Sequence, residues 1–98
     1  MELFAHLLHR LDEVSEGAGS LLDSTTVMSI SEVEDGNAHR HYNLPVVLAG
    51  RVGDLEMGRY LDITAMDQPI ANLYLTMLRD AGSSAQTFGD DGVTPLIV

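Results

Sequence analysis

The sequence predicts a small α/β domain in which two helices flank a mixed sheet of two to three strands. Two segments, 2–14 and 69–81, carry apolar residues at the three- and four-residue spacing of an amphipathic helix. Between them, positions 44–49 form a continuous apolar run that ends at Gly50. Helices on either side of an apolar strand are typical of layered α/β domains. With 98 residues there is room for one domain, so we expect positions 1–98 to form a single small domain or the C-terminal segment of a larger one.

The first predicted helix has an apolar stripe along one side. Glu2 precedes the stripe and favours the positive N-terminal end of the helix dipole. Gly17 and Gly19 follow the helix, so positions 16–20 are expected to form a turn. The residues of the stripe are Leu3, Phe4, Leu7, Leu8, Leu11 and Val14.

Strands are predicted from β-branched and apolar runs in the middle of the chain. Positions 25–31 combine β-branched residues with partial alternation. The apolar run 44–49 indicates a strand that is buried on both faces. Pro45 has no N–H to donate, so it belongs at the start of that strand or at a sheet edge. Positions 59–63 are interpreted as a short third strand.

The second helix is delimited by its flanking residues. Asp67 or Gln68 is the expected cap, Pro69 suits the first turn, and Gly82 stops the helix. The residues that follow are expected to be mainly loop. The apolar stripe predicted for this helix consists of Ile70, Leu73, Tyr74, Met77, Leu78 and Ala81.

Composition excludes several classes of function. Fifteen Asp and Glu residues oppose five Arg residues, there is no Lys, and the net charge is −10. Nucleic acids and anionic membranes are bound by clustered cations, so neither partner is expected. No apolar run reaches the roughly 20 residues of a membrane-spanning helix. The absence of cysteine excludes disulfides and thiolate chemistry.

The residues best suited to a functional site lie between the two main predicted strands. Glu32, Asp35, His39 and His41 combine carboxylates with imidazoles, which are ligands for divalent metals such as zinc or manganese. The two histidines would point the same way if the chain were locally extended. The alternative interpretation is a solvated acidic loop in which Asp35 begins a turn and the histidines are exposed.

A second arrangement of metal-ligand types occurs in the first helix. His6, His9 and Glu13 have helical spacing, but His9 lies almost opposite the apolar stripe. We therefore expect both histidines to face water rather than to hold a metal.

Several segments, in their order along the chain, resemble the C-terminal end of a large family of uncharacterised secreted bacterial proteins, domain of unknown function fifteen-fifty-two. The resemblance covers nearly the whole chain, and 35–50 and 88–90 are its most specific parts. The matching segments are 21–25, 34–39, 43–50, 58–59, 71–78 and 88–90.

That family is distantly similar to the alkaline phosphatase and sulfatase superfamily. The resemblance implies a three-layer fold of which this chain supplies the C-terminal part. It also implies a metal site with Glu32 or Asp35 in a carboxylate position and His39 or His41 in a later histidine position. The sequence departs from the superfamily pattern because no Asp-His pair follows Ile30. The superfamily's nucleophile and other ligands would lie upstream.

These observations lead to two hypotheses about function. In the first, the chain belongs to a metal-dependent phosphate- or sulfate-ester hydrolase, contributes part of a divalent metal site and is not catalytic alone. In the second, it is a non-enzymatic module that forms homo-oligomers or docks to a missing upstream segment through apolar faces. The N-terminal residues lack a basic leader, so a whole gene product would be cytoplasmic. A fragment of a longer precursor would be periplasmic or secreted.

Overall fold

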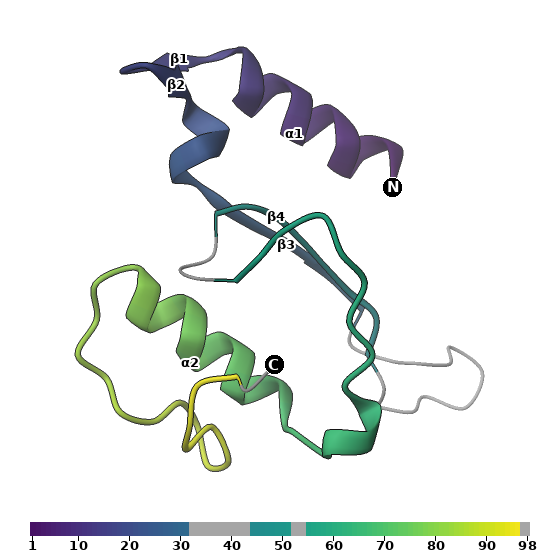
Figure 1. Cartoon of the computed structure of the whole chain (residues 1–98), viewed down its shortest axis with the longest axis vertical. Coiled ribbons are helices and arrows are strands. Elements are labelled where there is room, and N and C mark those ends of the chain that lie inside the picture. The colour runs from purple at the N-terminus through teal and green to yellow at the C-terminus, as the bar shows by residue number, and fades with distance from the viewer. Residues whose placement is uncertain (32–43, 52–54, 97–98) are drawn as a thin grey trace. The chain divides into compact units, whose positions relative to one another are not determined.

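The chain is a small mixed α/β protein, as the sequence predicts. The computed structural model describes residues 1–31, 44–51 and 55–96, which contain two α-helices and two antiparallel two-stranded sheets (Figure 1). The fold divides into two compact units, Met1–Arg51 and Val52–Val98. Each unit is described by itself below.

Helix α1, Glu2–Glu13, opens the first unit and confirms the first predicted helix. It contacts the 3-10 helix η1, Leu21–Ser24. Half of the predicted stripe, Phe4, Leu8 and Leu11, is partly buried. The other half is exposed, and Leu3 retains 86% of its accessible surface. The stripe is therefore only partly covered by the described residues of its own unit.

The predicted turn after α1 contains a short hairpin. Strands β1, Ser15–Glu16, and β2, Gly19–Ser20, pair around Gly17, whose φ of +58° is the left-handed conformation that glycine adopts easily. The hairpin leads directly into η1, where the Ser20 N–H donates to Asp23 Oδ2 at 2.8 Å. This capping interaction fixes the direction in which the chain enters the main sheet.

The main sheet consists of β3, Thr26–Ile30, and β4, Val46–Gly50. The strands are antiparallel, in a register that runs from Thr26 opposite Gly50 to Ile30 opposite Val46. Both strands were predicted, and β4 begins directly after Pro45 as expected. Continuing the register would place Pro45 opposite Ser31. Proline has no N–H to donate there, which explains why the ladder ends at Val46.

Gly50 ends β4 in a conformation that requires glycine. Its φ is +86°, and a Cβ atom at this position would overlap the backbone carbonyl of Thr25. The Arg51 N–H then donates to that same carbonyl at 2.9 Å. The close approach of the two backbones thus depends on the missing side chain.

The prediction that the 44–49 strand is buried on both faces is wrong for the described residues. β4 has β3 as its one strand neighbour among them, and Val47 retains 42% of its accessible surface. No residue described in the first unit is classed as buried. An apolar run predicts burial only when further elements cover the strand, and α1 packs mainly on η1.

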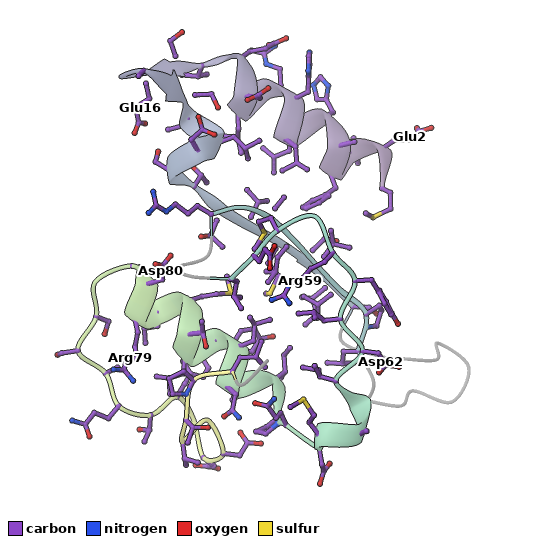
Figure 2. All side chains as sticks on the ribbon, in the orientation of Figure 1. Glu2, Glu16, Arg59, Asp62, Arg79 and Asp80 are labelled. Atoms are coloured by element: carbon purple, nitrogen blue, oxygen red, sulfur yellow. The ribbon has the colours of Figure 1, made fainter. Side chains whose placement is uncertain are left out.

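Helix α2, Ile70–Asp80, confirms the second predicted helix. Pro69 is its N-cap, Ala81 is its C-cap, and Gly82 follows with a φ of +100°. Figure 2 shows Arg79 in the last turn, where a cation favours the negative end of the helix dipole.

The expectation that Asp67 or Gln68 caps the helix, with Pro69 in its first turn, is wrong. Pro69 has an extended backbone (φ −68°, ψ 149°), so it is itself the N-cap and the helix begins at Ile70. Gly82 follows the helix as expected.

The buried face of α2 differs from the predicted stripe. Leu75 is completely buried although the stripe omits it, whereas Leu78, a member of the stripe, retains 36% of its accessible surface. Ala81 is also exposed. The residues of α2 that are buried are Ala71, Asn72, Leu73 and Leu75.

The C-terminal segment of the second unit packs on α2. The Phe88 ring lies 5.4 Å from the Tyr74 ring, centroid to centroid. Phe88 also forms an isolated antiparallel bridge with Gly92. A Cβ atom at Gly92 would lie 2.9 Å from the Cβ of Ala71. These contacts place the C-terminal segment against Ala71 and Tyr74 of the helix.

The prediction of a third strand at positions 59–63 is wrong. The structure describes these residues as irregular, with Tyr60 extensively exposed. A strand needs a neighbouring strand to satisfy its backbone groups, and no described strand forms a β-ladder with this segment.

Candidate functional site

The predicted metal ligands Glu32, Asp35, His39 and His41 lie outside the described residues. The structure does describe the strands that precede and follow them. Ile30, the last residue of β3, stands opposite Val46, the first residue of β4. Facing residues in an antiparallel pair have Cα atoms roughly 4.5–5.5 Å apart. The chain therefore leaves and re-enters the sheet at one end.

The chemistry of the intervening residues suits a divalent cation. Glu32, Glu34 and Asp35 supply three carboxylates, opposed by the single guanidinium of Arg40. Two imidazoles follow in the same segment. Zinc accepts both nitrogen and oxygen ligands, and manganese favours carboxylate oxygens. A bound cation would offset the excess negative charge of this segment.

The second arrangement of potential ligands, in α1, makes contacts at the protein surface. His9 Nε2 lies 2.7 Å from Glu13 Oε1, and Arg10 Nε lies 3.6 Å from Glu13 Oε2. His6 and His9 are both exposed, as predicted. Across 1–31, 44–51 and 55–96, no group of three or more His, Cys, Asp or Glu residues could hold a metal ion.

Other carboxylates of the first unit hold local structure together. Asp12 Oδ1 accepts a hydrogen bond from Ser20 Oγ at 2.9 Å and so joins α1 to the hairpin. Glu16 Oε1 accepts one from Ser24 Oγ at 2.8 Å. Figure 2 shows Glu16 in this hairpin, well separated from Glu2 at the start of α1. Asp12 and Glu16 therefore have structural roles in the hairpin and at its junctions with α1 and η1.

Asn72 is a polar residue that the sequence analysis did not single out. It retains 5% of its accessible surface. Its Nδ2 donates to Gln68 Oε1 at 3.3 Å, while its Oδ1 has no hydrogen-bond partner among the described residues. An unpaired buried acceptor costs about 1–3 kcal/mol. Periodicity offered no signal for it, because an asparagine between apolar positions is normally assigned to the exposed face.

Comparison with other proteins identifies no relative of this chain. Searches against protein-family models, curated proteins and solved structures each find no match. The relationship to the alkaline phosphatase superfamily therefore remains a prediction from the sequence motifs. Within the described part of the chain, neither helix has the length and apolar character needed to cross a membrane.

Proposed function

We propose that this chain is part of an alkaline-phosphatase- or sulfatase-like hydrolase and contributes ligands to a divalent metal site. The ligands are Glu32, Asp35, His39 and His41. The observation that supports the proposal is the pairing of Ile30 with Val46. This pairing anchors both ends of the ligand-bearing segment at one end of a regular sheet, and rigid anchors are what a metal site needs.

The carboxylates and imidazoles of this segment would hold zinc or manganese. A catalytic zinc site uses three protein ligands and keeps one position open for water or substrate. The bound metal would polarise a phosphate or sulfate ester and stabilise the developing negative charge. By the resemblance to the superfamily, the nucleophile of the complete enzyme would come from an upstream segment.

The burial of the first unit supports a role within a larger assembly. Its described residues are all at least partly exposed, although β3, β4 and the α1 stripe are largely apolar. Additional protein surface would cover these faces in the complete domain. We therefore propose that the chain binds the metal weakly and is not catalytic on its own.

Calorimetric titration with zinc and with manganese tests the proposal. We expect heat of binding from at least one metal and a tenfold or greater loss of affinity in His39→Ala or His41→Ala. His9→Ala is the matched control, because His9 is an exposed histidine on α1, and it should leave the affinity unchanged. Binding of neither metal, or affinity equal to wild type in both His39→Ala and His41→Ala, would contradict the proposal.

A second proposed function is a non-enzymatic module that associates through its apolar surface. The exposure of Leu3, Leu7 and Val47 favours it. Exposed apolar side chains of this kind are covered when protein surfaces associate. Light scattering over a range of concentrations tests this function, since a monomer at every concentration would exclude self-association.

A further inference from the structure

We draw no further inference here: the strongest candidate, the unpaired Asn72 Oδ1 on the buried face of α2, is a single acceptor closed to solvent, and nothing in the described part of the chain shows what group would donate to it.

Discussion

Helix α2 allows a sharp comparison between two leucines that lie three residues apart. Leu75 retains 0% of its accessible surface and Leu78 retains 36%. Replacing leucine by alanine removes three carbon groups, worth about 0.8 kcal/mol each when fully buried. Leu75→Ala should therefore cost about 2.4 kcal/mol for transfer alone, and the cavity that remains raises this to roughly 3–4 kcal/mol. Leu78→Ala should cost about 1.5 kcal/mol or less, because its site opens to solvent and leaves no closed cavity.

Urea denaturation of the two variants measures the difference between their free energies of unfolding. NMR signals of the α2 amides report on the second unit. A small domain is stable by roughly 5 kcal/mol, so Leu75→Ala should lose most of its stability while Leu78→Ala remains folded. Because both changes occur in the same helix and create the same residue, helix propensity cancels from the comparison. If Leu78→Ala loses as much free energy of unfolding as Leu75→Ala, or more, the assignment of the buried face is refuted.

Three further substitutions test individual contacts. Gly50→Ala should destabilise the first unit by a few kcal/mol in thermal unfolding, since the new Cβ meets the Thr25 carbonyl and φ is positive; no change would contradict that geometry. Thr76→Val removes the hydroxyl that accepts from the Leu96 N–H at 2.7 Å, so this amide should exchange faster while Leu75 stays protected. Asp23→Ala removes the acceptor of the Ser20 N–H and should lower the free energy of unfolding by about 1 kcal/mol in urea denaturation. Asp23→Asn keeps an acceptor oxygen and should lower it less.

The limits of the helices and of the main strands could be predicted because their signals are local. Pro69 and Gly82 act on the backbone of their own neighbours, and Pro45 has no N–H whatever surrounds it. Gly17 and Gly19 predicted the turn at 16–20 in the same way, although the two short strands β1 and β2 around it were not predicted. These features need no knowledge of the distant parts of the chain.

The buried face of α2 could not be predicted from the same signals. Apolar residues occur around most of the helix, including Ile70, Leu75 and Met77, so periodicity alone does not select one side. In the structure Gly92 lies close to Ala71, although these residues are far apart in the sequence.

For the candidate site, the sequence by itself determined the ligand types, the negative charge and the position of the segment between two strands. Only the tertiary structure decided that these strands are antiparallel neighbours, so that Ile30 and Val46 hold the ends of the segment together. The structure likewise decided that β4 is partly exposed and that, within the described part of the chain, β3 and β4 form a sheet of two strands. The physical reason is that charge, ligand chemistry and turn preference belong to individual residues. Burial and strand pairing depend on which distant segments come into contact.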